Sequence, residues 1–189
     1  MRPGNVWIYR ETDADENVLS VKVTVTDRTK RILGIEATVV HEKVIVDGEL
    51  AEDAIEWYAQ DTRGNLWFLG EDAKAFKNGE VVSTRGSWKA GVDGAQPGII
   101  LPAEPQVGMA YRKEYAAGEA EDEAEVLGVD AQIDVAAGSF EGVLLTKDFS
   151  ALNPGVVENT FYARGLGPVL VVGVSGEKFR KELSSIKRA

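Results

Sequence analysis

The sequence predicts an all-β fold, an antiparallel meander that forms a barrel or a strongly bent half-barrel. Apolar and polar residues alternate with a period of two in many segments, as they do in half-buried strands. Short turns rich in Gly, Asn and Asp separate these segments, and helical periodicity is nearly absent. Because a long open sheet would expose two edges, we expect this sheet to roll up.

The strands follow from the alternation. Val21, Val23 and Val25 alternate with Lys and Thr, and residues 156–163 alternate in the same way. β-branched and aromatic residues fill such segments, which suits a pleated, half-buried surface. We expect strands at 5–12, 17–27, 31–46, 50–61, 64–71, 74–78, 80–85, 106–116, 122–135, 139–149, 156–163, 167–175 and 177–184.

The turns between these strands are marked by residues that tolerate positive φ. Asp47-Gly48 and Asn78-Gly79 each separate two apolar runs, as in two-residue type I′ hairpins. In the segment 61–65, Asp61 can accept hydrogen bonds from backbone amides. Short turns of this kind join neighbouring antiparallel strands, which predicts the connectivity of a meander.

One stretch, residues 86–105, departs from the pattern. Its four glycines and three prolines rule out a long regular element, yet Trp88, Ile99 and Leu101 are too apolar for a flexible linker. We expect a long ordered loop that packs through these anchors. A domain boundary is the alternative, but the flanking hairpins lack a separate core, so we predict one β domain over 1–189.

Composition excludes several classes of partner. The net charge of −10, from 31 acidic and 21 basic residues, disfavours nucleic acid. No apolar run is long enough for membrane insertion. The absence of Cys excludes disulfides and thiolate chemistry, and a single histidine, His41, excludes a histidine-rich metal centre. The sequence leaves the oligomeric state open.

The segment 109–115 is the first candidate site. Alternation places Tyr111, Lys113 and Tyr115 on one face and Arg112 and Glu114 on the other. If the second face is interior, its charges must pair or bind a ligand, because an unpaired buried charge is very unfavourable. If that face is exterior, they form an ordinary surface pair. The sequence supports both readings.

Aromatic residues extend the candidate site. The tryptophans Trp57, Trp67 and Trp88 could stack on a ring-shaped ligand, although core packing explains such residues equally well. The predicted ligand-binding residues are Tyr58, Trp67, Trp88, Arg112, Glu114 and Tyr115.

Acidic residues suggest a second kind of site. Oxygen ligands suit Ca²⁺ if folding brings them together, although no EF-hand spacing is present. The candidate metal ligands are Glu71, Asp72, Glu121 and Asp122. A solvated charged face is the alternative, and no other cofactor is predicted.

Several segments resemble a family of bacterial exported proteins and lipoproteins of unknown function, which have a bent antiparallel sheet, either a half-barrel or a lipocalin-like barrel. The similar segments include residues 57–61, 86–88, 111–115 and 162–167. The resemblance implies a location outside the cytoplasm, and an export signal in the full-length form. It implies no reaction and no catalytic residue.

Three hypotheses about function follow. The first is an extracytoplasmic binding protein that holds a small molecule or metal ion on its concave face. The second is an enzyme on the same scaffold, with acid/base or isomerisation chemistry from carboxylates, tyrosine and Arg112. Under this second hypothesis His41 is a possible general base, but a hydrogen-bonded residue within the sheet is the favoured interpretation of its position. The third is an envelope protein whose sheet edge pairs with another chain.

Overall fold

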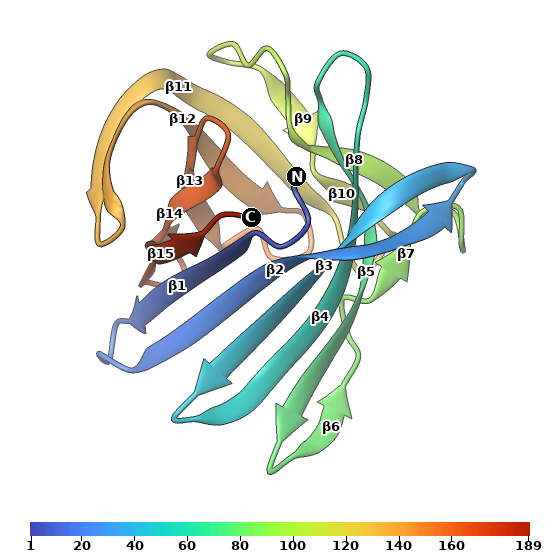
Figure 1. Ribbon diagram of the computed structural model, residues 1–189, viewed down its shortest axis with the longest axis horizontal. Coiled ribbons are helices and arrows are strands. Elements are labelled where there is room, and N and C mark those ends of the chain that lie inside the picture. Colours follow the sequence, from blue (N-terminus) through green and yellow to red (C-terminus); the bar gives the residue numbers. More distant parts are fainter.

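The computed structural model describes all 189 residues and consists of strands joined by turns (Figure 1). The strands are β1 (Val6–Asp13), β2 (Val18–Ile32), β3 (Ile35–Val46), β4 (Glu49–Gln60), β5 (Leu66–Lys77), β6 (Glu80–Ser83), β7 (Trp88–Lys89), β8 (Gln96–Leu101), β9 (Ala110–Arg112), β10 (Glu114–Tyr115), β11 (Asp122–Val135), β12 (Gly138–Ser150), β13 (Val157–Ala163), β14 (Gly167–Ser175) and β15 (Phe179–Lys187). No helix able to cross a bilayer is found.

The strands form one antiparallel sheet in the order β10-β8-β5-β4-β3-β2-β1-β15-β14-β13-β12-β11-β9, and β6 and β7 attach to β5. The first strand pairs with the last, so the two termini meet in the same wall (Figure 1). The two ends of the order, β9 and β10, are consecutive in the chain and are connected through Lys113. The sheet is therefore a nearly closed barrel with one seam that backbone pairing does not seal. The predicted meander and barrel are confirmed.

Two predicted strand breaks are absent. The predicted strands 17–27 and 31–46 leave a gap at 28–30, but β2 continues to Ile32, and the hairpin turns at Leu33-Gly34. A register shift between Val25 and Thr29 absorbs the irregular segment as a bulge. The predicted strands 64–71 and 74–78 are likewise one strand, β5.

The stretch 86–105 is ordered, as predicted, but is more regular than a loop. It returns to β5 twice, through β7 at Gly70 and Glu71 and through β8 at Leu66–Phe68. Gly70 has a φ of +122°, and a side chain there would collide with the Trp88 carbonyl. This glycine lets β7 approach β5 closely enough to pair.

The predicted strand 106–116 is divided in two. β9 pairs with β11, whereas β10 pairs with β8 on the other side of the seam. The amide of Lys113 still donates to the carbonyl of Asp122, at 2.8 Å, and the next residue already belongs to β10. This change of partner interrupts the side-chain alternation on which the prediction for 109–115 depended.

The interior changes character along the barrel axis. On β1 the inward-facing residues are Trp7 and Tyr9, both buried, followed by the half-buried Glu11. On β13, Tyr162 and Thr160 are buried, and Glu158 is half-buried. We call the end of the barrel at which β1 begins the apolar end, and the end at which β1 finishes the acidic end.

Two further pieces pack around this barrel. Buried residues on the outer face of the sheet, among them Ile32, Trp57 and Leu69, form a core beneath the tip of the β2–β3 hairpin. The long β11–β12 hairpin curves back to the wall near β15, where the amide of Ala137 donates to the carbonyl of Leu183 at 3.0 Å. The apolar end is therefore well packed, which leaves the acidic end as the place for a site.

Candidate functional site

Carboxylate side chains line the inner face of the barrel towards its acidic end. On β4, the inward-facing positions are Glu52, Ala54, Glu56 and Tyr58, while Trp57 faces outward. The other strands contribute acidic residues at equivalent levels. Their half-buried inward carboxylates, together called the inner carboxylate cluster, are Glu11, Glu42, Glu52, Glu56, Glu71, Glu114, Asp122 and Glu158.

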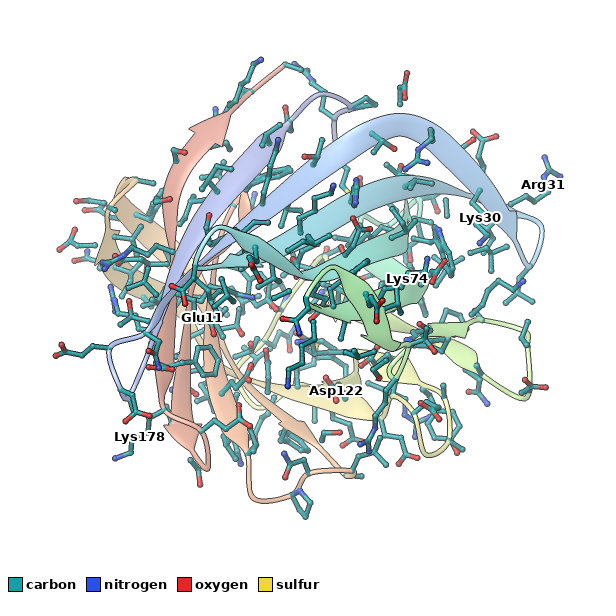
Figure 2. The ribbon with its side chains drawn as sticks, turned by 90° about the horizontal axis from the view of Figure 1, so that it is seen from below. Glu11, Lys30, Arg31, Lys74, Asp122 and Lys178 are labelled. Carbon is teal, nitrogen blue, oxygen red and sulfur yellow. The ribbon has the colours of Figure 1, made fainter.

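Strand register brings these carboxylates together. Glu56 lies directly across the ladder from Glu71, and one inward-facing residue, Ala54, separates Glu52 from Glu56. Figure 2, a view from below, shows Glu11 of β1 and Asp122 of β11 on different parts of the sheet. The cluster therefore surrounds the interior instead of occupying one surface patch.

The crowding raises the proton affinity of Glu71 and Glu114. Burial raises the pKa of Glu71 to about 8, and the carboxylates of Glu114, Glu52, Glu42 and Asp122 add to the effect. Burial raises the pKa of Glu114 to about 7, with Asp122 adding to it, while the hydrogen bond from Trp88 and the charge of Lys113 act in the opposite direction. Both groups therefore exchange protons near neutral pH.

Glu56 and Tyr58 are perturbed in the same sense. Burial raises the pKa of Glu56 well above its ordinary value, and Glu42 and Glu71 reinforce the shift. Burial also raises the pKa of Tyr58, with Glu56 as the next cause. A proton on Glu56 avoids the unfavourable burial of a charge that no ion pair offsets.

Two lysines face this interior, and one of them is already committed to an ion pair. The ammonium of Lys113 lies 3.0 Å from an Oδ2 of the buried Asp148. Asp148 also accepts hydrogen bonds from Thr146 and Thr160, each at 2.7 Å. Lys181 on β15 is the second lysine, and it lowers the pKa values of Glu52, Glu56 and Glu158 against the effect of burial.

Aromatic rings form the part of the wall next to the carboxylates. The ring of Tyr58 stacks on Phe68 with centroids 4.9 Å apart, and Phe68 meets Trp88 edge-on at 5.4 Å. The indole N–H of Trp88 donates to an Oε2 of Glu114 at 2.9 Å. Rings and carboxylates thus belong to one connected surface.

Three of the predicted ligand-binding residues meet in this wall, namely Tyr58, Trp88 and Glu114. Arg112 does not join Glu114: it is exposed, and its guanidinium lies over the ring of Tyr115 at 4.4 Å. The predicted shared face of Arg112 and Glu114 is therefore wrong. The reason is the change of partner strand at Lys113, after which Glu114 turns inward directly behind an inward-facing lysine.

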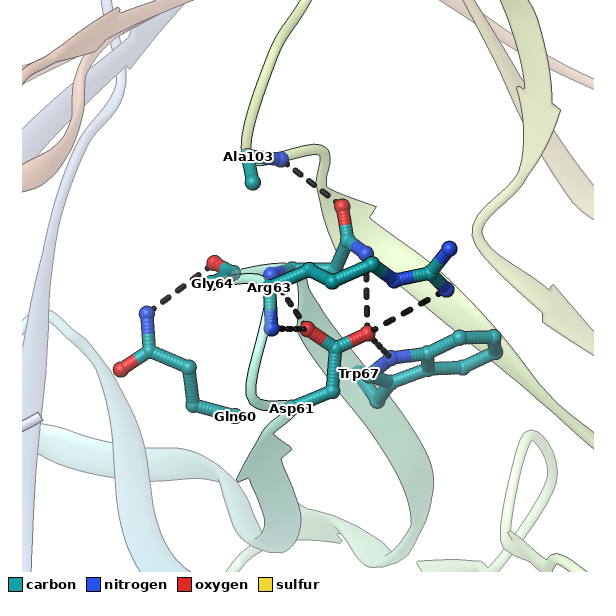
Figure 3. A network of polar contacts seen from close by, with 7 residues as sticks. Gln60, Asp61, Arg63, Gly64, Trp67 and Ala103 are labelled. Atoms are coloured by element: carbon teal, nitrogen blue, oxygen red, sulfur yellow. Dashed lines mark hydrogen bonds and ion pairs between the residues drawn. The ribbon is translucent and has the colours of Figure 1, made fainter.

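Trp67 has a different place, at the start of β5 beside the turn that joins β4 to β5. Its indole N–H donates to Asp61 at 3.0 Å, and Asp61 also accepts from the amides of Arg63 and Asn65 (Figure 3). The side chain of Asn65 in turn accepts from the amide of Ala103 at 2.8 Å. The network stabilises the turn and ties Ala103 to it. Hydrogen bonds, that from the Asn65 side chain first, hold the pKa of Asp61 well below its ordinary range.

The four candidate metal ligands separate in the structure. Glu71 and Asp122 face the interior, whereas Asp72 faces outward and pairs with Lys74 at 3.3 Å. Glu121 accepts a hydrogen bond from the amide of Gly118 in the turn before β11. No group of three or more His, Asp or Glu side chains has an arrangement that could hold a metal ion. His41 is bonded to Asp53 at 3.0 Å within the sheet.

Sequence reasoning missed most of the inner carboxylate cluster. Glu11, Glu42 and Glu158 were assigned no role, although each stands in the register of inward apolar residues. Glu42, for example, lies between Val40 and Val44 on one face of β3. A glutamate in phase with core residues is the signal that could have identified them.

A separate groove lies at the ends of β1 and β15, with a volume of about 480 Å³. It is lined by Arg10, Asp13, Lys178, Phe179 and Arg180 together with neighbouring residues. Arg180 is paired with Glu182 at 2.9 Å. The groove is open and shares no residue with the inner carboxylate cluster, so the two features are independent.

Comparisons with known proteins establish the fold of this chain. Neither a protein-family model nor a curated protein matches it by sequence. Among solved structures, one similar chain is a suspected exported protein with a YmcC-like fold from Bacteroides fragilis. It has a TM-score of 0.59 and 13% identity over 99% of this chain and 97% of that one. The present chain shares the YmcC-like fold.

A second solved structure with this fold is a suspected lipoprotein from Parabacteroides distasonis. Its TM-score is 0.50 and its identity 10%, over 98% of this chain and 96% of that one. The two likenesses extend over nearly the whole length of each chain, so the bent antiparallel sheet predicted from the sequence resemblance is confirmed. At these identities they establish the YmcC-like fold alone.

Proposed function

We propose that this protein is an extracytoplasmic binding protein that holds a small organic cation, a compound with one or more ammonium groups, at the inner carboxylate cluster. The observation that carries the proposal is the imbalance of charge inside the barrel. Eight half-buried carboxyl groups from seven strands face one free lysine, Lys181, because Lys113 is already paired with Asp148.

The energetics favour a cationic ligand. Like charges held together in a partly desolvated interior repel one another, and the folded chain relieves the repulsion by keeping protons on groups such as Glu71. A ligand cation would take the place of these protons and form direct ion pairs. Binding should therefore release protons and should strengthen as the pH rises.

The geometry favours an organic cation over a metal ion. Metal binding requires several oxygen ligands converging on one point, and no such group is present. The carboxylates are instead spread around the wall beside the Tyr58 ring, which stacks on Phe68. Carboxylates next to aromatic faces are the combination that recognises alkylammonium groups.

The proposed location rests on the two structural neighbours. One is named as a suspected exported protein and the other as a suspected lipoprotein. The same full-length fold supports a common setting outside the cytoplasm for the present chain.

The proposal is tested by thermal melting and titration calorimetry at pH 8 with tetramethylammonium, 1,4-diaminobutane and Ca²⁺. We expect at least one of the organic cations to raise the melting temperature in a saturable manner and to release protons on binding. A response to Ca²⁺ alone would replace the proposal with a metal site. No response to any of the three would contradict cation binding.

Matched variants locate the binding site. Glu56→Gln and Glu71→Gln remove charge from the cluster and should each weaken binding of the organic cation by roughly tenfold, from the loss of one desolvated ion pair. Glu80→Gln removes the same charge from an exposed position on β6 and should leave the affinity unchanged. Equal weakening in all three variants would show a non-specific effect of net charge.

One observation favours a second candidate, an enzyme. A carboxyl group with a pKa of about 7, as Glu114 has, is suited to general acid–base catalysis near neutral pH. Arg112 lies outside such a site, so this candidate would depend on Glu114, Glu71 and Tyr58. An enzymatic role predicts that Glu114→Gln abolishes turnover of a bound amine while binding persists.

A further inference from the structure

Lys181 occupies a special position in the interior. It lies on β15, where Glu11 of β1 and Val171 of β14 are its cross-strand neighbours. It is two residues from Leu183, which is fully buried on the inner face. Its side chain therefore points inward, at the acidic end of the barrel and at the level of Glu11.

This lysine is surrounded by acidic groups but paired with none. It acts on Glu11 of β1, on Glu52 and Glu56 of β4 and on Glu158 of β13, lowering the pKa of each. Nevertheless no carboxylate oxygen lies within 4.0 Å of its ammonium group. Lys113 is the opposite case, since it is fixed at 3.0 Å from a single aspartate.

We infer that Lys181 is an internal counter-cation that competes with the ligand and so sets the affinity of the inner carboxylate cluster for cations. The inference rests on the proposed function and adds a residue role to it. In the empty protein Lys181 shares its charge among several carboxylates. A ligand ammonium must then enter beside a like charge, which weakens binding.

The inference predicts a gain of affinity on mutation. Lys181→Met keeps the length of the aliphatic side chain and removes the charge. We expect it to bind 1,4-diaminobutane roughly tenfold more tightly than the unmodified protein at pH 8, because one repulsive charge at close range is removed. Lys181→Arg retains the charge and should keep the original affinity.

The matched control is Lys22→Met. Lys22 is exposed on the outer face of β2, between the inward-facing Val21 and Val23, and its replacement changes the net charge equally. Titration calorimetry of the four proteins with 1,4-diaminobutane should show tighter binding only for Lys181→Met. A similar gain in Lys22→Met would assign the effect to net charge and would overturn the inference.

A measurement without ligand separates this role from simple stabilisation. Carboxyl NMR signals followed against pH record the titration of Glu52, Glu56 and Glu158, the groups of β4 and β13 whose pKa values Lys181 lowers. We expect the titration midpoints to move to higher pH in Lys181→Met and to stay in place in Lys22→Met. An unmoved midpoint would show that Lys181 does not act on the cluster.

The outcomes also distinguish the two proposals. Binding by the unmodified protein with equal or weaker binding by Lys181→Met would overturn the role of Lys181 and leave cation binding intact. Binding by Lys181→Met alone would support the competition and would contradict cation binding as the function of the unmodified protein. The absence of binding in every variant would overturn both.

Discussion

Lys113 and Asp148 show how an ion-pair partner stabilises a charge inside this barrel, in contrast to the carboxylates of the inner cluster. The side chains of Lys113 and Asp148 are 17% and 8% exposed and 3.0 Å apart, and two threonine hydroxyls complete the bonding of the aspartate. Glu56, Glu71 and Glu114 of the inner cluster have no cation at ion-pair distance, and burial raises the pKa of each of them. The same barrel thus contains a satisfied charge, with a structural role, and unsatisfied ones, which indicate binding.

The satisfied pair leads to a prediction at this scale. Lys113→Met leaves Asp148 charged and buried without its cation, which should lower the free energy of unfolding by about 3–5 kcal/mol. Urea unfolding followed by fluorescence measures the change. The control is Lys74→Met, because Lys74 and Asp72 are 41% and 49% exposed and such surface pairs contribute about 1 kcal/mol or less. Comparable losses in the two variants would contradict the importance of burial.

At the scale of elements, the crossing from β9 to β10 decides both the closure of the barrel and the direction of Glu114. The crossing passes directly over β8 at Gly98, where a Cβ atom would lie 2.3 Å from the Lys113 carbonyl carbon. Any side chain at this position would push β8 away from the crossing. The close packing of β8 against the crossing therefore requires a glycine because a Cβ atom does not fit there. The backbone of Gly98 has no positive φ that would also require it.

We predict that Gly98→Ala destabilises the protein by about 1–3 kcal/mol, the usual effect of overpacking. It should also weaken cation binding, because Glu114 moves with the crossing. Gly155→Ala is the control, since no atom lies within 4 Å of its Cβ position and its φ is not positive. Thermal melting compares the two. A Gly98→Ala protein as stable as Gly155→Ala would mean that the crossing is not tightly packed.

At the scale of the whole molecule, the acidic interior makes stability depend on pH. The pKa of Glu71 rises from 4.5 to about 8 on folding, so the folded chain binds this proton more tightly than the unfolded chain. The resulting stability is fully present below pH 4.5 and is lost as the pH rises towards 8. Glu56 and Glu114 act in the same direction, whereas the lowered pKa of Asp61 matters only in stronger acid.

We therefore predict a melting temperature that falls steadily between pH 5 and pH 8.5. Glu71→Gln mimics the protonated group and should flatten this dependence, while Glu80→Gln on β6 should leave it as in the unmodified protein. Scanning calorimetry in buffers of constant ionic strength checks both. A melting temperature that rises with pH over this range would contradict protonation of the interior.

The sequence by itself determined the local structure of this protein. Period-two alternation and the Asp-Gly and Asn-Gly turns predicted antiparallel hairpins, and the length of the resulting sheet predicted closure. It also indicated Tyr58, Trp88 and Glu114, which meet in one wall. Strands and turns depend on the backbone preferences of residues that are close together in the sequence, so they can be predicted without tertiary contacts.

Only the tertiary structure decided which face of each strand is interior. Alternation separates two faces, and the usual rule assigns the charged one to solvent, which on β4 would place Glu52 and Glu56 outside. Whether Glu114 faces the interior depends on the change of partner strand at Lys113, and the alternation of residue types does not reveal this change. Contacts between strands far apart in the sequence bring these carboxylates into one cluster. Which distant strands pair is decided by the closure of the whole barrel.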